Sequence, residues 1–253
     1  MSKIDYKKET KKIVKFIQDT FKEKGFEKAI IGISGGLDSA VVVALLIKAL
    51  GKDNVCSYYI PIETPKNCTA DAFVVSDKFK NHMDTNGIKR FIEMFTITFP
   101  ELKTEKIRLG NLIARTRMMM LYDMSAKHNA LVVGTSNKTE LTLGYFTLHG
   151  DGACALEPIG HLYKTQVKQL AGYLEVPKQI IEKAPSAELW EGQTDENEIG
   201  MVYEDIDNIL MLLLDNKNLT STIDLYGKEN VDKILKLCFK NKFKSESPQI
   251  IKD

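Results

Sequence analysis

The stretch AIIGISGGLDS at residues 29–39 decides the fold of this chain. An apolar run enters two glycines, Asp38 and Ser39 follow, and the apolar run AVVVALL comes next. This order predicts a short buried strand at 29–33, a tight turn, and a buried helix at 39–50. A strand, a glycine turn and a helix N-terminus together present backbone N–H groups to an anion. The stretch therefore predicts a phosphate-binding turn.

The glycine turn by itself does not identify a ligand. The nucleotide-binding pattern G-x-x-x-x-G-K-[ST] is absent, because no lysine precedes Ser39. The dinucleotide-binding pattern G-x-G-x-x-G is absent as well. A purely structural interpretation stays open, in which the glycines serve a tight turn and Asp38 and Ser39 cap the following helix.

A carboxylate in a phosphate-binding turn is explained if a cation lies between the two negative groups. Magnesium is a hard ion that takes one or two carboxylates together with phosphate oxygens. This hypothesis predicts a second acidic residue near the carboxyl end of a neighbouring strand. The expected strand at 130–135 is followed by Glu140, on the rim where open α/β sheets bind ligands. We therefore expect Asp38 and Glu140 to be the magnesium ligands.

The rest of the chain alternates helical and strand patterns. The expected strands are apolar without alternation, which is typical of parallel strands covered on both faces. The fold class is therefore expected to be α/β, a single Rossmann-like doubly wound parallel sheet flanked by helices, with extra C-terminal helices. The expected strands are 29–33, 55–62, 89–95 and 130–135, and the expected helices are 4–24, 39–50, 67–86, 101–128, 164–174, 196–214 and 226–241.

One domain is expected over residues 1–253. Its nucleotide-binding core would span about 25–175, and a helical part would follow at 196–253. Residues 136–163 look irregular and are rich in Gly, His, Asp and Thr, and a long irregular stretch inside a compact domain is usually functional. Residues 182–195 are expected to form a mobile loop.

Composition narrows the function classes. A net charge of +1 over 253 residues gives no general attraction to nucleic acid or to an anionic membrane. The N-terminus lacks the apolar core of a signal peptide, and no apolar run is long enough to cross a bilayer. Its four cysteines form no Cys-x-x-Cys pair, so neither a zinc ribbon nor a redox motif is indicated. We expect a cytoplasmic protein with no nucleic-acid or membrane partner.

The motif SGGLDS at 34–39 resembles the loop of the N-type ATP pyrophosphatases, which split ATP between its α and β phosphates. Four further stretches resemble the ammonia-dependent NAD synthetases, in order and with matching spacing. The resemblance implies conversion of deamido-NAD, ATP and ammonia into NAD, AMP and pyrophosphate through an adenylated nicotinate carboxylate, with Mg²⁺ and a homodimer. The stretches are GNLIARTRM (110–118), VVGTSNKTELTLGYFTLHGD (132–151), PIGHLYKTQVKQLA (158–171) and PSAELWEGQTDENEIG (185–200).

The resemblance also implies residue roles at the ATP end. Asp38 and Glu140 would hold Mg²⁺, and Lys164 would act on the phosphates. A serine on the mobile loop, Ser186, would touch phosphate. The implied ATP and pyrophosphate ligands are Ser34, Gly35, Gly36, Asp38, Ser39, Thr135, Lys164 and Ser186.

At the deamido-NAD end the resemblance implies Arg115, Asp151, Glu198 and Lys244. Asp151 is the candidate to bind ammonium and accept a proton, although an Asp after Gly in a loop is often a turn residue. Arg115 suits an anionic part of the substrate, because its planar fork matches carboxylate or phosphate. A surface ion pair is the open alternative for Arg115.

The chain departs from the family pattern near the nicotinate. Many members have Lys-Tyr where this chain has Leu148 and His149, and an acid where it has Ala155. The C-terminal His-Lys pair of many members reads Phe243-Lys244 here. These departures put the details of nicotinate recognition and tail closure in question, and they leave the ATP end untouched.

Two other functions are alternatives to NAD synthesis. A related enzyme that activates an RNA base for sulfur insertion would need paired cysteines and a basic surface, which this sequence lacks. A nucleotide sensor without turnover would not require Asp38, Glu140 and Lys164 together. Glutamine-using relatives carry an extra amidohydrolase domain for which 253 residues leave no room, so free ammonia, or ammonia from another chain, is expected.

Overall fold

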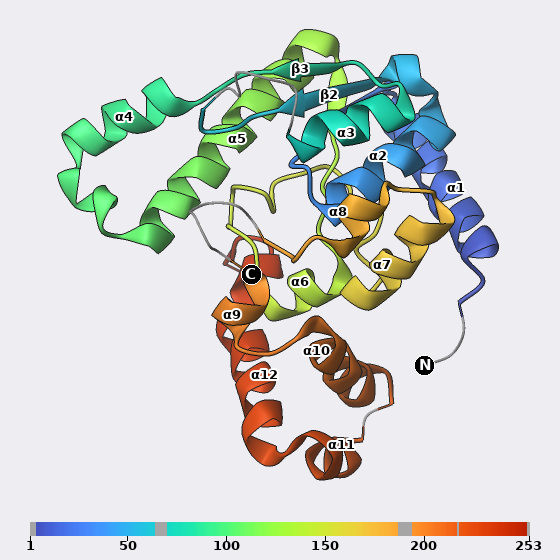
Figure 1. The fold of residues 1–253 in the computed structure, drawn as a ribbon, viewed down its shortest axis with the longest axis vertical. Coiled ribbons are helices and arrows are strands. Elements are labelled where there is room, and N and C mark those ends of the chain that lie inside the picture. Colours follow the sequence, from blue (N-terminus) through green and yellow to red (C-terminus); the bar gives the residue numbers. More distant parts are fainter. Residues whose placement is uncertain (1–3, 64–69, 187–193, 217, 252–253) are drawn as a thin grey trace.

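The computed structural model describes residues 4–63, 70–186, 194–216 and 218–251 (Figure 1). The first helix, α1 (Tyr6–Lys24), begins after Asp5, whose side chain accepts a hydrogen bond from the N–H of Lys8. It ends at Gly25, which adopts the left-handed conformation at φ +72°. Both ends therefore follow from capping residues that flank the helical pattern.

A parallel four-stranded sheet forms the centre, in the order β3-β2-β1-β4. Ala29 of β1 pairs with Val55 on one side and Leu131 on the other. Strands β2 and β3 lie on one side of β1 and β4 on the other, so the strand order reverses between β1 and β4. This confirms the doubly wound sheet. The strands are β1 (Lys28–Gly32), β2 (Val55–Tyr59), β3 (Met83–Thr85) and β4 (Ala130–Val132).

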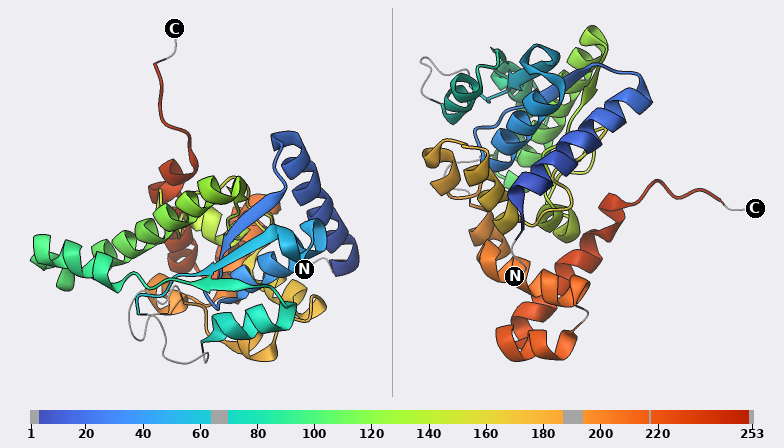
Figure 2. Two further views of the ribbon diagram at one scale, coloured as in Figure 1. Left: turned by 90° about the horizontal axis from the view of Figure 1, so that it is seen from above. Right: turned by 90° about the vertical axis from the view of Figure 1, so that its right-hand side faces the viewer.

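Helices cover both faces of the sheet, as Figures 1 and 2 show. Ile31 of β1 belongs to a core shared with α1, α2, α3 and α7, whereas Ile30 belongs to the opposite core with α4 and α5. Burial on both faces explains the unbroken apolar runs of the strands. These helices are α2 (Leu37–Leu50), α3 (Asp71–Phe79), α4 (Lys89–Thr98), α5 (Lys106–His128) and α7 (Lys164–Tyr173).

The third expected strand, at 89–95, is wrong, because these residues form part of α4. The true edge strand β3 is only three residues long and falls inside the expected helix 67–86. Asn81 explains its position: its side chain accepts from the Ser57 hydroxyl and donates to the carbonyl of Val55 at 2.8 Å. The buried side chain of Asn81 thus holds the segment just before β3 against β2. A hydrophobic pattern does not reveal such a contact.

The C-terminal part forms a third apolar core that includes Leu143, Ile206 and Ile234. The expected helix 196–214 is divided at Gly200, whose φ is +71°. A second glycine with positive φ, Gly227 at φ +78°, separates the last two α-helices. The elements are α6 (Lys138–Leu143), α8 (Lys178–Glu182), α9 (Asp195–Ile199), α10 (Tyr203–Leu210), a π turn at Met211–Asp215, α11 (Leu219–Tyr226) and α12 (Lys228–Asn241).

The helix α4 and the start of α5 extend away from the sheet (Figure 2), and several exposed apolar residues belong to this region. Ile97 and Ile107 are 79% and 78% exposed, and Phe91, Met94 and Phe99 are exposed as well. Within the part of the chain that the structure describes, none of the helices is sufficiently long and apolar to cross a membrane.

Candidate active site

The glycine turn lies at the carboxyl end of β1, next to the point where the strand order reverses. Gly35 has φ +86°, and a Cβ atom there would lie 2.9 Å from the Cβ of Asp71, so only glycine fits. The Ser34 and Ser39 hydroxyls are 3.2 Å apart, and the Ser34 hydroxyl accepts the N–H of Gly36 at 3.1 Å. The turn is therefore held in shape by its own backbone conformation and hydrogen bonds.

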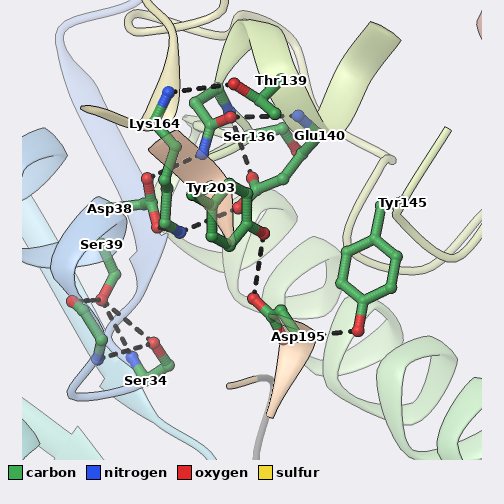
Figure 3. A network of polar contacts seen from close by, with 12 residues as sticks. Ser34, Asp38, Ser39, Ser136, Thr139, Glu140, Tyr145, Lys164, Asp195 and Tyr203 are labelled. Atoms are coloured by element: carbon green, nitrogen blue, oxygen red, sulfur yellow. Dashed lines mark hydrogen bonds and ion pairs between the residues drawn. The ribbon is translucent and has the colours of Figure 1, made fainter. Parts of the chain in front are cut away.

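Asp38 does not cap its helix, because its carboxylate points to residues from two distant elements (Figure 3). The Lys164 Nζ atom lies 2.5 Å from Asp38 Oδ2 and 3.0 Å from Glu140 Oε1. The side chain of Lys164 is 8% exposed, and each carboxylate is 15% exposed. One ammonium group thus joins the two carboxylates that the sequence singled out.

The three charges perturb one another strongly. The pKa of Glu140 is raised to about 8: burial is the largest cause, Lys164 lowers the pKa in part, and the like charge of Asp38 adds to the increase. Burial by itself would lower the pKa of Lys164, but the two carboxylates reverse this effect, and the pKa lies above its ordinary value. Lys164 therefore stays charged near neutral pH, and further positive charge beside Glu140 would favour the ionised form of that carboxyl group.

Glu140 reaches this position because α6 begins with a capping box. Asn137 accepts the N–H of Glu140 at 3.0 Å, and Glu140 Oε2 accepts the N–H of Asn137 at 3.2 Å. The Asn137 side chain also donates to Asp38 Oδ1 at 3.0 Å. Our sequence interpretation missed Asn137, although the spacing N-x-x-E at 137–140 was a helix-start signal within a stretch that we expected to be irregular.

A second group of polar residues, of which Asp195 and Tyr203 are buried, adjoins the cluster. The Tyr203 hydroxyl donates to Asp195 Oδ2 at 3.1 Å, and Lys164 Nζ lies 5.2 Å from the centre of the Tyr203 ring. The Tyr145 hydroxyl contacts Asp195 at 3.3 Å and Glu198 at 2.5 Å. Burial raises the pKa of Asp195. This network, in which sequence reasoning had identified Glu198 alone, runs from Lys164 through Tyr203 and Asp195 to Tyr145 (Figure 3).

A cavity of about 1280 Å³ collects most of the expected site residues. Gly35 and Arg115 do not line it. Arg115 is exposed and donates from Nε to the carbonyl of Leu148 at 3.2 Å, whereas Arg117 lines the cavity and donates to the carbonyl of Ile60. The expected residues on the wall are Ser34, Gly36, Asp38, Ser39, Thr135, Glu140, Asp151, Lys164, Ser186, Glu198 and Lys244.

Lys244 braces the loop that carries Asp151. Its Nζ atom donates to the carbonyls of Gly144 at 2.7 Å and Phe146 at 2.9 Å. Asp151 accepts the N–H of Thr147 at 3.0 Å and is open to the cavity. Asp151 is thus both a turn residue and a cavity residue.

Part of the expected loop 182–195 lies outside the described residues, which end at Ser186 and resume at Thr194. Before it, Lys183 pairs with Asp71 at 2.7 Å, so the segment starts beside the glycine turn. In the described part of the chain, no three His, Cys, Asp or Glu side chains converge as a metal cluster. Asp38 and Glu140 nevertheless fit Mg²⁺, which shares its coordination with phosphate oxygens.

Known proteins are similar to this chain over its whole length. The sequence model described as NAD synthase matches residues 9–248. The chain belongs to the NAD synthase family. A relative from Fusobacterium nucleatum named NH(3)-dependent NAD(+) synthetase is 43% identical over 258 residues, covering all of this chain and 99% of that protein.

Two solved structures share the fold of this chain. An NH3-dependent NAD synthetase from Campylobacter jejuni is 33% identical, with a TM-score of 0.84 over 99% of this chain and 100% of that chain. An NMN synthetase from Francisella tularensis is also 33% identical, with a TM-score of 0.83 over 98% and 99% of the two chains. The parallel sheet and its helices are therefore the fold of this ligase family.

Proposed function

We propose that this chain converts deamido-NAD, ATP and ammonia into NAD, AMP and pyrophosphate. One observation carries the assignment: Lys164 joins Asp38 and Glu140 at the strand-order reversal, in the large cavity of a chain from the NAD synthase family. The curated relatives named NH(3)-dependent NAD(+) synthetase support this reaction. The chain is thus a ligase that forms a C–N bond.

The reaction needs ATP because a carboxylate does not react directly with ammonia. An oxygen of the nicotinate carboxylate attacks the α-phosphorus, the bond to the bridging oxygen breaks, and pyrophosphate leaves with the electron pair. Backbone N–H groups at Ser34–Ser39 and the ammonium of Lys164 would stabilise the charge that develops on pyrophosphate. Ammonia then attacks the acyl carbon of the adenylate, and AMP leaves after the nitrogen has lost a proton.

Asp38 and Glu140 would hold Mg²⁺, and hard carboxylate oxygens suit that ion. When bound, the ion neutralises phosphate charge and orients the leaving group. In the structure the ammonium of Lys164 lies between the two carboxylates and balances part of their negative charge. ATP binding is therefore expected to move Lys164 from the carboxylates toward phosphate oxygens.

Asp151 is proposed as the residue that binds ammonium and accepts its proton. It is open to the cavity, and its carboxylate is already oriented by the N–H of Thr147. Glu198 and Lys244 line the same cavity and would contact deamido-NAD. Arg115 would reach the substrate only from outside this cavity, so its role as a deamido-NAD ligand is the weakest of the four.

A second substrate is favoured by one observation. The Francisella structure titled NMN synthetase is as similar to this chain as the Campylobacter structure titled NAD synthetase, at 33% identity each. Amidation of nicotinate mononucleotide is therefore the alternative reaction. Leu148, Ala155 and Phe243, where the chain departs from the family pattern, are candidates for a difference in substrate.

The chain is also proposed to act as a cytoplasmic homodimer. The exposed apolar residues of α4 and α5, including Met94, Ile97 and Ile107, would suit a second copy of the chain. The cysteines within the described residues, Cys56, Cys154 and Cys238, are all free thiols, which agrees with a reducing compartment.

The test is an assay with ATP, Mg²⁺ and ammonium, in which AMP and the amide product are followed with deamido-NAD and with nicotinate mononucleotide in parallel. We expect AMP and NAD to form in equal amounts and deamido-NAD to have the higher kcat/KM. A higher kcat/KM for the mononucleotide would establish the alternative substrate. ATP binding without pyrophosphate release from either substrate would favour a nucleotide sensor instead.

A further inference from the structure

Asp207 of α10 is a buried carboxylate that no part of the proposed mechanism uses. The residue is 0% exposed and does not line the cavity. A buried carboxylate is retained at a cost unless hydrogen bonds or charges compensate it. Its partners therefore indicate what it does.

Both oxygens of Asp207 accept hydrogen bonds from other helices. The Thr139 hydroxyl of α6 donates to Oδ1 at 2.5 Å, and the N–H of Thr165 in α7 donates to Oδ2 at 2.8 Å. The Thr139 hydroxyl oxygen in turn accepts the N–H of Lys164 at 3.0 Å, a contact visible in Figure 3. A continuous hydrogen-bonded chain thus runs from α10 through α6 to the start of α7.

The N–H groups of Lys164 and Thr165 are the first two of α7. Such groups have no acceptor within their own helix. Thr139 and Asp207 supply the acceptors from outside, and a carboxylate near a helix N-terminus is further stabilised by the helix dipole. The direction and register of the first turn of α7 therefore depend on two other helices.

This first turn carries Lys164, whose ammonium lies between Asp38 and Glu140. Thr139 directly precedes Glu140 in α6. The same hydrogen-bonded chain thus fixes the backbone on both sides of the Lys164–Glu140 contact. Neither Thr139 nor Asp207 lines the cavity, so any influence on the reaction must pass through these two neighbours.

We propose that Asp207 and Thr139 are positioning residues that set Lys164 and Glu140 in register for ATP. The inference rests on the proposed function, because it concerns the residues that would act on ATP. The proposal means that a C-terminal helix, α10, helps to position the residues of the phosphate site.

The test uses Thr139→Val, which keeps the volume but removes the hydroxyl, and Thr139→Ser, which restores it. Asp207→Asn retains the shape and an acceptor for Thr165 while removing the charge. Thr222→Val is the matched control, because Thr222 is also 0% exposed and hydrogen-bonded, but to Asn218 within the C-terminal helices. For each full-length variant, kcat, both KM values, the affinity for ATP with Mg²⁺ and the unfolding temperature are measured, the kinetics well below unfolding.

We expect Thr139→Val to lower kcat about 10- to 100-fold, the range expected for a misplaced catalytic group, and to weaken ATP binding. The KM for the nicotinate substrate should stay within about twofold, because the phosphate end alone is displaced. Thr139→Ser should recover most of kcat, Asp207→Asn should fall between the two, and Thr222→Val should keep parental kinetics even if it unfolds at lower temperature.

The proposal is overturned if Thr139→Val keeps the parental kcat and ATP affinity, or if Thr222→Val loses as much activity as Thr139→Val. A parent protein that binds ATP but forms no amide would contradict the proposed function instead. In that case ATP affinity decides the positioning role: weaker binding by Thr139→Val than by Thr139→Ser supports it, and equal binding overturns it.

Discussion

The two ends of the cavity are built differently. At the phosphate end, defined by residues 34–39 with Glu140 and Lys164, charged side chains are buried and come from the starts of three helices. At the nicotinate end, defined by Asp151, Glu198 and Lys244, they come from a loop, a short helix and the C-terminal tail. The phosphate end is thus fixed by the sheet, whereas the nicotinate end depends on connecting segments.

This difference between the two ends indicates where amino-acid changes are tolerated. A phosphate group is the same in every substrate, and backbone N–H groups at a helix start recognise it without a particular side chain. In the proposed function the nicotinate end must distinguish one nucleotide from another. Two departures from the family pattern, Leu148 and His149, stand close to Asp151 in sequence, and a third, Phe243, directly precedes Lys244. Loops tolerate such changes without loss of the fold.

The largest effect is expected from Lys164→Met. It removes the cation between Asp38 and Glu140 and leaves two buried carboxylates facing each other. We expect kcat to fall about 100- to 1,000-fold, the range for loss of one positioned charge-stabilising donor. The rate of AMP formation at saturating substrates measures this loss of kcat.

Lys138→Met is the matched control, since Lys138 pairs with Asp215 outside the cavity and the variant should keep kcat within a few-fold of the parent. Equal losses of kcat in both variants would contradict a role of Lys164 in the mechanism.

Asp38→Asn and Glu140→Gln come next. Each removes one proposed magnesium ligand while keeping the side-chain shape, and we expect about a 100-fold loss of kcat that higher Mg²⁺ concentrations partly restore. Titration of activity with Mg²⁺ provides the measurement. If both variants turn over like the parent, the magnesium assignment is wrong.

The third prediction concerns Glu157, a carboxylate in the segment between α6 and α7. Its carboxylate accepts the N–H of Ser136 and the thiol of Cys154. Burial raises its pKa from 4.5 to about 7, so the folded chain binds more protons than the unfolded chain between these values. The free energy of unfolding should therefore fall as pH rises from 5 to 7, by about 2 kcal/mol from this group. Urea unfolding at each pH is the measurement. Glu157→Gln should lose most of this slope, and an unchanged slope would contradict the account.

The smallest effect is expected from Lys244→Met. Without the ammonium that braces the carbonyls of Gly144 and Phe146, the loop to Asp151 should loosen. We expect the KM for the nicotinate substrate to rise about tenfold and kcat, which depends on Asp151 in the proposed mechanism, to fall a few-fold, while the KM for ATP stays nearly unchanged. Lys240→Met, on the exposed surface of α12, is the control. A rise in the KM for ATP as large as the rise for the nicotinate substrate would show that the two ends are not independent.

Local sequence patterns went far in predicting the fold. The glycine turn, the long helices and three of the four strands follow from apolar runs and end signals, which act over a few residues. The third strand was misplaced because β3 is held by Asn81, a single buried side chain, rather than by a hydrophobic pattern. Gly200 divided an expected helix for a similar reason: its left-handed backbone interrupts an apolar periodicity that otherwise continues.

The sequence by itself determined the glycine turn and the doubly wound α/β class, and it singled out the residues that are proposed to act on ATP, because these follow from short motifs and from strand order. The tertiary structure decided how the charges meet. Lys164 lies 126 residues from Asp38 in sequence, and only the parallel strands and the starts of α2, α6 and α7 bring their side chains into contact. Only the tertiary structure identifies four further polar residues of the site, since a buried polar residue is identified by its partners and not by its own position in a sequence pattern. These are Asn137, Asp195, Tyr203 and Asp207.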